Sequence, residues 1–358
     1  MTGPSDAVDV VVIGGGLAGA SVAYHVVAAG ARAVLVDRHD AGRATDAGAG
    51  ILSPETTRVA GEAWAALARD CGRYYRELAR ELPGDHGFGE CGLLSVALGT
   101  WDTEACDELA ARSPGLAPIG ADEARARFPP LADVTRAYWN PGAARVDGRR
   151  FAAAVLTAAE AMGLERVAAS ADRVAPGRVE AGGRVLRCGA VVVSGGAWSP
   201  QVAAQVGADL PVAPERGQIA HLRVDADTSG WPIVSPVLGD YFVPWPGGRV
   251  ATGATREPGA GFAAHTTVAG LRQLANEVAR VAPGLVDAEV LEVRVGLRPA
   301  SSDGLPVLGP VAGGVFVATG YGADGLLLSP WCGRLVASWA LGAPVDDALE
   351  PFLATRFA

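Results

Sequence analysis

The sequence predicts an α/β protein in which a doubly wound domain is interleaved with an α+β domain built on a mixed, largely antiparallel sheet. Residues 10–37 predict a strand, a glycine turn, a helix and a second strand, the unit from which doubly wound sheets are built. Between residues 218 and 281, several strands precede one long helix, an order that favours an antiparallel sheet. Residues 296–330 are rich in glycine, as the first segment is, so we expect the first and last segments to meet around one ligand.

The opening unit is typical of a dinucleotide site. The apolar residues 8–13 suit a buried parallel strand, and the glycines after them supply a tight turn, a close approach to a pyrophosphate and a helix-on-strand contact. These glycines are Gly14, Gly15, Gly16 and Gly19. The phosphates are expected at the N-terminus of helix 17–29, and Asp37 follows the second strand, where a carboxylate binds the ribose hydroxyls. The unit does not separate FAD from NAD, because both contain the same adenosine diphosphate half.

The next segments introduce the second domain. Residues 41–53 are too small and flexible for a regular helix or strand, which lets the backbone approach a ligand. A helix is predicted at 62–82, ended by a Pro-Gly pair. It is followed by a strand at 89–98, a mostly helical stretch with proline breaks at 102–131 and a loop-like stretch at 138–146.

The doubly wound domain is expected to resume after an alanine-rich helix at 150–162, with strands at 164–175 and 184–193. Residues 191–200 predict a buried strand that runs into a second glycine turn. The remaining expected elements are strands at 218–224 and 241–252 and helices at 267–281 and 331–341. No linker or internal repeat separates the domains, which favours interleaving.

Composition limits the class of protein. The 358 residues suffice for two domains with full cores, and a hydrophobic content of 49% indicates an ordered globular protein. A net charge of −9 without any basic run argues against nucleic acid or an anionic membrane surface as a partner. The first strand follows Met1 closely and no apolar run reaches spanning length, so we expect a cytoplasmic enzyme that acts on a small molecule.

Cysteine and lysine usage excludes several chemistries. Five scattered cysteines without CxxC spacing argue against a disulfide framework and against a zinc site, and we expect no metal. They are Cys71, Cys91, Cys106, Cys188 and Cys332. All 30 cationic side chains are arginines, which excludes a Schiff-base lysine, a Walker lysine and a lysine that activates oxygen.

Five segments, in order along nearly the whole chain, resemble the D-amino-acid oxidase family of FAD-dependent amine oxidoreductases, and glycine oxidases within it most closely. They are IGGGLAG from Ile13, GRATDAGAGIL from Gly42, VVVSGGAWS from Val191, YFVPWPGGRVATGAT from Tyr241 and GLRPASSDGLPVLGP from Gly296. The resemblance implies an extended FAD under a substrate domain, and hydride loss from an amine α-carbon to flavin N5, after which water hydrolyses the imine. We expect the FAD-binding domain at residues 1–85, 141–213 and 292–358, and the substrate-binding domain at 86–140 and 214–291.

The resemblance also implies roles for individual residues. Arg298 matches an arginine that clamps the substrate carboxylate, a task suited to a planar guanidinium, although an arginine on the sheet surface or against the flavin is the alternative. Tyr241 matches a tyrosine that helps to hold that carboxylate, unless it is only a half-buried strand aromatic. Gly50 and Ile51 match residues against the flavin, unless they are structural filler. The other expected FAD contacts are Asp37, Arg38, Arg43, Ala44, Thr45, Ala49, Val174, Gly195, Trp198, Gly322, Ala323, Asp324, Gly325, Leu326 and Leu327.

The chain departs from the glycine oxidase pattern just before its last helix. A His-aromatic-Arg-Asn turn is replaced by the four residues 321–324, so a second carboxylate-binding arginine is missing and space is gained at Gly322 and Ala323. Asp324 is a candidate to attract a cationic amine or to accept its proton, or else it caps the helix. We expect noncovalent FAD, because the chain lacks a match to the flavin-linking cysteine of sarcosine oxidases or the linking histidine of related dehydrogenases.

Together these features predict an FAD-dependent oxidase or dehydrogenase that acts on the C–N bond of a small amino acid or amine and passes electrons to O2 or another acceptor. Three alternatives stay open: oxidation and cleavage of an N-substituted amino acid, oxidation of a 2-hydroxy acid, and a noncatalytic or partner-dependent FAD-binding subunit. A nicotinamide dehydrogenase is disfavoured, because the GLRP segment and the last glycine segment have no role in one.

Overall fold

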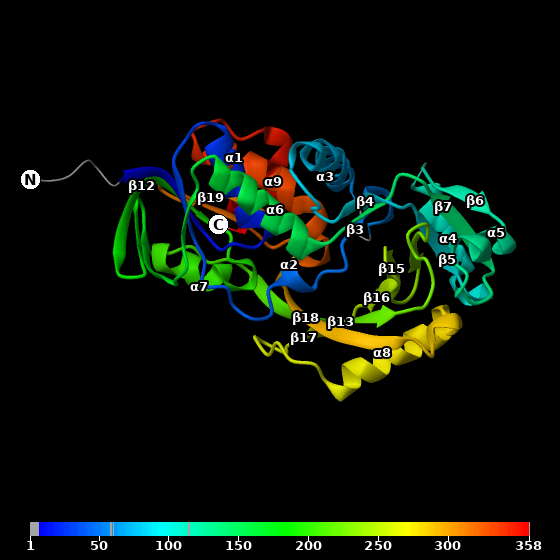
Figure 1. Ribbon diagram of the computed structural model, residues 1–358. Helices are drawn as coiled ribbons and strands as arrows, with labels where there is room; N and C mark the ends of the chain where they lie inside the picture. The colour runs from blue at the N-terminus through cyan, green and yellow to red at the C-terminus, as the bar shows by residue number, and fades with distance from the viewer. Residues whose placement is uncertain (1–6, 58, 60, 114, 358) are drawn as a thin grey trace, which may run out of the picture.

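The computed structural model describes residues 7–57, 59, 61–113 and 115–357, and its strands form two large sheets (Figure 1). Residues 1–6, with which the first predicted domain begins, lie outside the described residues. The first sheet is parallel at its centre, where β1 pairs with both β2 and β12, and β12 pairs in turn with β20. Its described strands are β1 (Ala7–Ile13), β2 (Ala33–Val36), β9 (Glu165–Val167), β10 (Ala171–Ala175), β11 (Arg178–Ala181), β12 (Arg184–Val193), β19 (Val307–Ala312) and β20 (Val315–Thr319).

Helices cover one face of this first sheet (Figure 1). The helices α1 (Leu17–Ala28), α6 (Gly148–Ala161) and α9 (Gly325–Ala340) share one hydrophobic core with β1 and β2, and α3 (Glu62–Glu81) packs on α9. Side chains of the opposite face form a second hydrophobic core with α7 (Ser199–Ala203) and with the antiparallel hairpin of β10 and β11, which continues the sheet beyond β12. This arrangement leaves the carboxyl ends of β1, β2 and β12 at one edge, which is where ligands bind in open α/β sheets.

The second sheet is antiparallel except where β14 runs parallel to β5. Its described strands are β5 (Leu93–Ala97), β6 (Ala117–Ile119), β7 (Arg136–Asn140), β13 (Val212–Arg223), β14 (Ile233–Pro236), β15 (Tyr241–Trp245), β16 (Arg249–Gly253), β17 (Glu257–Pro258) and β18 (Glu289–Ser301). The helix α8 (Val268–Val281) covers one face through buried side chains such as Leu274, whereas α4 (Thr100–Ala111) and α5 (Ala121–Arg127) lie around β6 and β7 (Figure 1).

The strands β13 and β18 connect the two sheets. They pair along their length, from Val212 opposite Ser301 to Arg223 opposite Glu289, and Figure 1 shows them passing below α2 (Ala44–Ala47). A small third sheet is formed by β3 (Ile51–Leu52), β8 (Ala144–Val146) and β4 (Phe88–Glu90). The predicted fold class, a doubly wound α/β unit joined to an α+β unit with a mixed, largely antiparallel sheet, is confirmed. The domain boundaries stay a prediction.

The structure corrects several predicted elements. The stretch 138–146, expected to be loop-like, contains the end of β7 and all of β8, because a Pro-Gly turn separates two strands that pair in different sheets. The stretches 164–175 and 241–252 each hold two strands instead of one. In the second case Gly247 and Gly248 form the turn, with φ of +83° and +78°, a conformation that glycine adopts without strain. The mostly helical stretch 102–131 also contains the strand β6.

The last helix begins six residues earlier than predicted, at Gly325 instead of residue 331, and Pro330 lies inside it. A proline has no N–H to donate to the carbonyl one turn before it, which here belongs to Leu326. The hydroxyl of Tyr75 on α3 donates to that carbonyl instead, so the helix continues through the proline. Within the described ranges, no helix combines the length and the apolar character needed to cross a membrane.

Candidate functional site

A cavity of about 700 Å³ lies between the two large sheets, at the carboxyl ends of β1, β2 and β12. Its lining combines the glycine turn after β1, the segment from Asp37 to Ile51, the turn after β12, parts of β15 and β18, and the start of α9. The three candidate catalytic residues, Arg298, Tyr241 and Asp324, all line it. The structure thus brings together residues that are up to about 300 positions apart in the chain, as the sequence predicts for its first and last segments.

The glycine turn forms one wall of the cavity and leaves no room for side chains. Gly14 has a φ of +102°, and a Cβ on it would lie 2.5 Å from the carbonyl oxygen of Ser194 in the turn after β12. A Cβ on Gly15 would lie 2.6 Å from Oδ2 of Asp37. Gly19 does not line the cavity; it lies behind the turn, where a Cβ would clash with the carbonyl oxygen of Gly14. Each glycine therefore permits a close approach, as expected for this motif.

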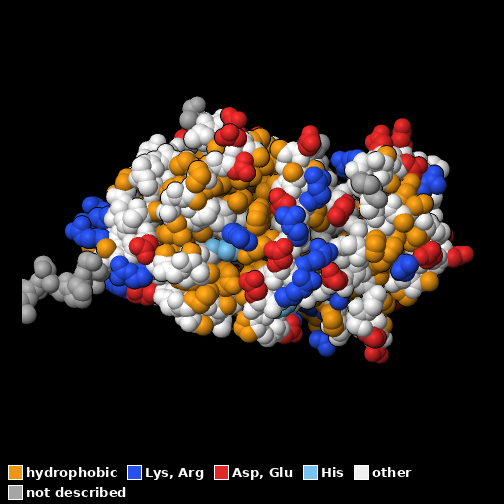
Figure 2. Space-filling view, turned by 90° about the horizontal axis from the view of Figure 1, so that it is seen from above, with side chains coloured by type: hydrophobic (Ala, Val, Ile, Leu, Met, Phe, Trp, Pro, Cys, Tyr) orange, Lys and Arg blue, Asp and Glu red, His pale blue; other side chains and the backbone are white. Residues whose placement is uncertain are grey.

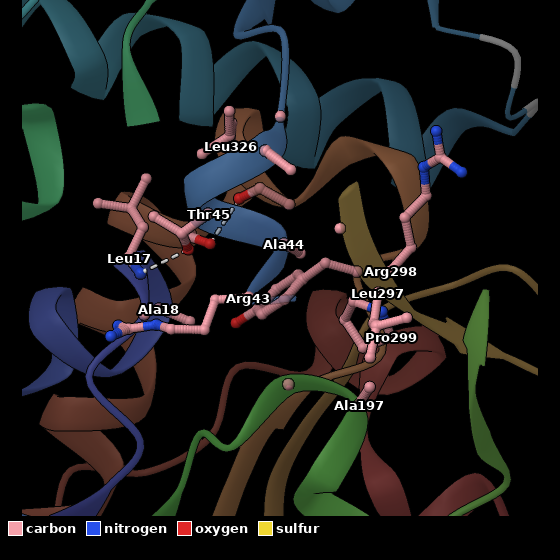
Figure 3. Close-up of a pocket in the computed structure, with 18 of the residues that line it drawn as sticks. Leu17, Ala18, Arg43, Ala44, Thr45, Ala197, Leu297, Arg298, Pro299 and Leu326 are labelled. Atoms are coloured by element: carbon pink, nitrogen blue, oxygen red, sulfur yellow. Dashed lines mark hydrogen bonds between the residues drawn. The ribbon is translucent and has the colours of Figure 1, made fainter. Parts of the chain in front are cut away.

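The carboxylate of Asp37 is held in place at the end of β2. Its Oδ2 accepts a hydrogen bond from Nη1 of Arg43 at 3.1 Å, and both side chains are mostly buried, with 17% and 11% of their surface exposed. Figure 3 shows Arg43 extending past Ala18 toward this end of the cavity. The Oγ1 of Thr45 accepts from the backbone N–H of Leu17 at 3.0 Å, which ties the turn after β2 to the first residue of α1. Thr45 thereby contacts the helix N-terminus as well as the cavity.

The segment after β2 packs directly on β18. The backbone N–H of Leu297 donates to the carbonyl of Gly42 at 2.8 Å, and a Cβ on Gly296 would lie 2.8 Å from the Cβ of Ala47. Arg43 follows Gly42 and Arg298 follows Leu297, and in Figure 3 the two arginine side chains extend from this junction in opposite directions. One junction therefore sets the positions of both arginines, at the two ends of the cavity.

The guanidinium of Arg298 packs on β13 at Gly217, which has no side chain. Its Nη1 donates to Oε1 of Glu215 at 3.0 Å and to the carbonyl of Thr255 at 3.1 Å. A Cβ on Gly217 would lie between 2.5 and 2.6 Å from three atoms of the guanidinium, so the space above Gly217 is filled by Arg298. With 14% of its side chain exposed, Arg298 is fixed by an ion pair and by packing, and it faces the cavity. It is not a free surface arginine.

Tyr241 and Arg256 lie at the same end of the cavity as Arg298. Burial raises the pKa of Tyr241 to about 12, although the neighbouring guanidinium of Arg298 opposes the shift. The phenol therefore stays protonated over the working range of an enzyme and can donate a hydrogen bond. Nη1 of Arg256 lies 3.3 Å from the same Oε1 of Glu215 that Arg298 contacts, so one carboxylate holds two guanidinium groups.

The start of α9 closes the cavity on the other side. Residues 322–327, which include Asp324 at the N-cap position, all line it. The Asp324 side chain makes no capping hydrogen bond to α9, a helix whose residues are all described. The capping interpretation of Asp324 is therefore not supported, and its place in the lining leaves the role toward a substrate or cofactor open.

The structure gives Gly50 a second reason to be glycine and places Val174 away from the cavity. Gly50 lines the cavity with Ile51, but its φ of +83° and the nearby carbonyl oxygen of Val146, 1.7 Å from a built Cβ, already require glycine. The structure does not bring Val174 to the cavity. Its side chain is buried in the core of the first sheet, and its backbone N–H donates at 2.9 Å to Oε1 of Gln205, which does line the cavity.

Sequence reasoning missed several polar residues of the lining. They are Ser53, Thr56, Thr57, Ser170, Gln201, Gln205, Ser235, Asp240, Arg256 and Gln273. Most lie in short elements without a recognisable spacing. Ser53, Asp240 and Arg256 carried a weak signal, because each directly flanks a segment that the family resemblance already covers.

The residues of the cavity fit an extended dinucleotide such as FAD. The bare glycine turn and the N-terminus of α1 suit a pyrophosphate, and Asp37 suits a ribose. The backbone amides at the start of α9 suit the developing negative charge of a reduced flavin ring. Among the described residues, no group of three or more His, Cys, Asp or Glu side chains is arranged to hold a metal ion.

Comparison with known proteins places these features in a wider context. The family described as "FAD dependent oxidoreductase" (DAO) matches residues 9–339. An uncharacterized oxidoreductase, YurR, from Bacillus subtilis is 34% identical, with 96% of this chain and 97% of the relative covered. The crystal structure of iminodiacetate oxidase from Chelativorans sp. BNC1 superposes with a TM-score of 0.90 at 36% identity, covering 96% of this chain and 98% of that one. That of glycine oxidase from Geobacillus kaustophilus also reaches 0.90, at 28% identity, covering 98% and 99%.

Proposed function

Because the chain belongs to the DAO family of FAD-dependent oxidoreductases, we propose that it oxidises the C–N bond of a small amino acid or amine whose carboxylate binds Arg298. The cofactor prediction, FAD, is confirmed, and the chain is an enzyme of the amine or amino-acid oxidase and dehydrogenase type. Noncovalent attachment of FAD, the identity of the electron acceptor and a cytoplasmic location stay predictions.

One observation carries the substrate assignment. Arg298 and Tyr241 both line the cavity, lie close enough for the guanidinium to affect the pKa of the phenol, and carry hydrogen-bond donors. Arg298 extends away from the end of the cavity at which Arg43 lies (Figure 3). A guanidinium pairs with a carboxylate through two parallel hydrogen bonds, and a protonated phenol adds a third. A carboxylate bound there places the rest of a small substrate toward the segment from Ala44 to Ile51 and the start of α9.

When bound, FAD accepts two electrons and one proton from the carbon beside the substrate nitrogen, and water then cleaves the resulting C=N bond into a carbonyl compound and an amine. The residues of the chain supply position and electrostatics. Arg298 fixes the carboxylate and so limits which C–H bond faces the flavin. Ile51 and Leu326, which line the cavity with apolar side chains, exclude water from the reacting carbon. Asp324 is a candidate to accept the ammonium proton, so that a neutral amine reacts.

A second candidate, an N-substituted amino acid, is favoured by the small residues Gly322 and Ala323. They line the cavity where glycine oxidases have bulky side chains in the sequence pattern discussed above, and so they leave room for a second group on nitrogen. The similarity to a protein named iminodiacetate oxidase supports this candidate, since iminodiacetate is a secondary amine.

The proposal is tested by mixing the FAD-loaded protein, without oxygen, with glycine, sarcosine, iminodiacetate, D-alanine and glycolate, and recording the visible flavin band. We expect at least one amine to bleach the band and glycolate to leave it unchanged. Bleaching by glycolate alone would assign the site to 2-hydroxy acids. A yellow protein that no amine bleaches would contradict the proposal and favour a noncatalytic or partner-dependent subunit. Admitting air afterwards separates an oxidase from a dehydrogenase.

A further inference from the structure

Two arginines share one carboxylate at the substrate end of the cavity. Oε1 of Glu215 lies 3.0 Å from Nη1 of Arg298 and 3.3 Å from Nη1 of Arg256. Both arginines line the cavity, but Arg298 is mostly buried whereas 55% of the Arg256 side chain is exposed. One carboxylate neutralises only one of two guanidinium groups, so the cluster keeps a positive charge that faces the cavity.

Further polar residues line the cavity in addition to Arg298 and Arg256, which are held by Glu215. Ser235, Gly239, Asp240 and Gln273 line the same part of the cavity, and Asp240 is 8% exposed. Nε2 of Gln273 lies 3.4 Å from Oδ2 of Asp240. The lining therefore contains the buried carboxylate of Asp240 as well as the two guanidinium groups of Arg256 and Arg298.

An amine with two carboxylate arms matches this pattern of charges. At neutral pH it carries one ammonium and two carboxylates. A substrate with a single carboxylate needs only Arg298, which leaves Arg256 without a role toward it. With two arms, the second carboxylate reaches the second guanidinium, and the ammonium lies among groups of opposite charge such as Asp240.

We propose that the site accepts an iminodiacid, with Arg298 binding the carboxylate of the arm that is oxidised and Arg256 binding the carboxylate of the other arm. This proposal rests on the proposed function of C–N oxidation at the same site. Oxidation removes two electrons and two protons from one N–CH2 unit, FAD accepts them, and water splits the C=N bond. An iminodiacid and water then give an oxo acid and a primary amino acid. Glu215 is a positioning residue that holds both guanidinium groups.

The inference is tested by binding, independently of turnover. Diglycolate is the ether analogue of an iminodiacid and has no nitrogen to oxidise, and methoxyacetate is the same ether with one carboxylate. We expect the FAD-loaded protein to bind diglycolate about tenfold more tightly than methoxyacetate, the scale of one charge-assisted contact. Titration calorimetry and the shift of the flavin spectrum both report the two dissociation constants.

The variant Arg256→Gln should abolish this preference, because the second carboxylate of diglycolate then loses its guanidinium partner. Arg256→Lys should keep part of the preference, since it keeps the charge. The control is Arg223→Gln, an exposed arginine at the far end of β13 that pairs with Glu289, and it should behave as wild type.

Equal affinities for the two ethers in the wild type, or a preference that Arg256→Gln retains, would overturn the inference and leave Arg256 as a partner of Glu215 only. The proposed function fails separately, when no amine reduces the flavin in the anaerobic panel. If the protein oxidises sarcosine but shows no preference for diglycolate, the proposed function stands and the assignment of an iminodiacid as substrate is wrong.

Discussion

A single methyl group at Gly217 provides a sharp test of the carboxylate clamp. A Cβ at this position would lie 2.5 Å from Nη2 and 2.6 Å from Cζ and Nη1 of Arg298, whereas ordinary contacts begin at 3.4 Å. Gly217 lies within β13 and its φ is not positive, so alanine suits the backbone. The substitution Gly217→Ala must therefore move the guanidinium by about 1 Å, and a displacement of that size costs about 100-fold in rate when it misplaces a substrate.

We expect Gly217→Ala to lower kcat/KM for the best substrate of the anaerobic panel by about 100-fold, between the wild type and Arg298→Ala, which should lose about two to four orders of magnitude. The control is Gly120→Ala, at the N-cap of α5, where a Cβ meets nothing within 4 Å. FAD content and thermal unfolding show whether each variant is folded and loaded. If Gly217→Ala binds FAD normally and keeps wild-type kcat/KM, Arg298 does not act as a fixed clamp.

Three further predictions concern the cofactor cradle, the last helix and acid stability. Gly15→Ala should raise the dissociation constant of FAD about 10- to 100-fold, because the new Cβ would lie 2.6 Å from Oδ2 of Asp37; unchanged FAD affinity in a fluorescence titration would refute this role of Asp37. Tyr75→Phe should lower the free energy of unfolding by about 1–3 kcal/mol in urea, because a buried carbonyl of α9 loses the donor that replaces the missing N–H of Pro330, and a loss near zero would contradict that account. Burial lowers the pKa of His221 to about 4 from its usual 6.5, so the unfolded chain binds the extra proton first and stability falls as pH drops from 6.5 toward 4. His221→Leu should therefore reduce the loss of stability between pH 7.5 and 5 by about 2 kcal/mol, and an identical pH dependence in the two proteins would show that His221 does not contribute.

The glycine turn was predictable because its chemistry is local. The turn, helix and acid follow one another within 10–37, and each glycine there meets a constraint that spacing alone signals. The split of residues 241–252 into a hairpin also has a local signal, since Gly247 and Gly248 mark its turn.

The contacts of the substrate end depend on distant parts of the chain. Arg298 and Glu215 are 83 residues apart and meet only through the register of β13 and β18. The position of Val174 illustrates the same limit, because alternation along β10 decides whether a side chain enters the core or the cavity, and no motif fixes that alternation. Pro330 suggested a helix boundary, and only the hydroxyl of Tyr75 from another helix explains why the helix continues.

The pairing of β13 with β18 has a consequence for how this enzyme can diversify. A shift of β18 by one residue would turn Arg298 to the opposite face of the sheet and put an apolar neighbour such as Leu297 in its place. Insertions and deletions in β18 would thus remove the carboxylate clamp that Arg298 provides. Changes of substrate within this lineage should accumulate instead at positions such as Ser235, Arg256 and Gln273, which line the cavity without holding the two sheets together.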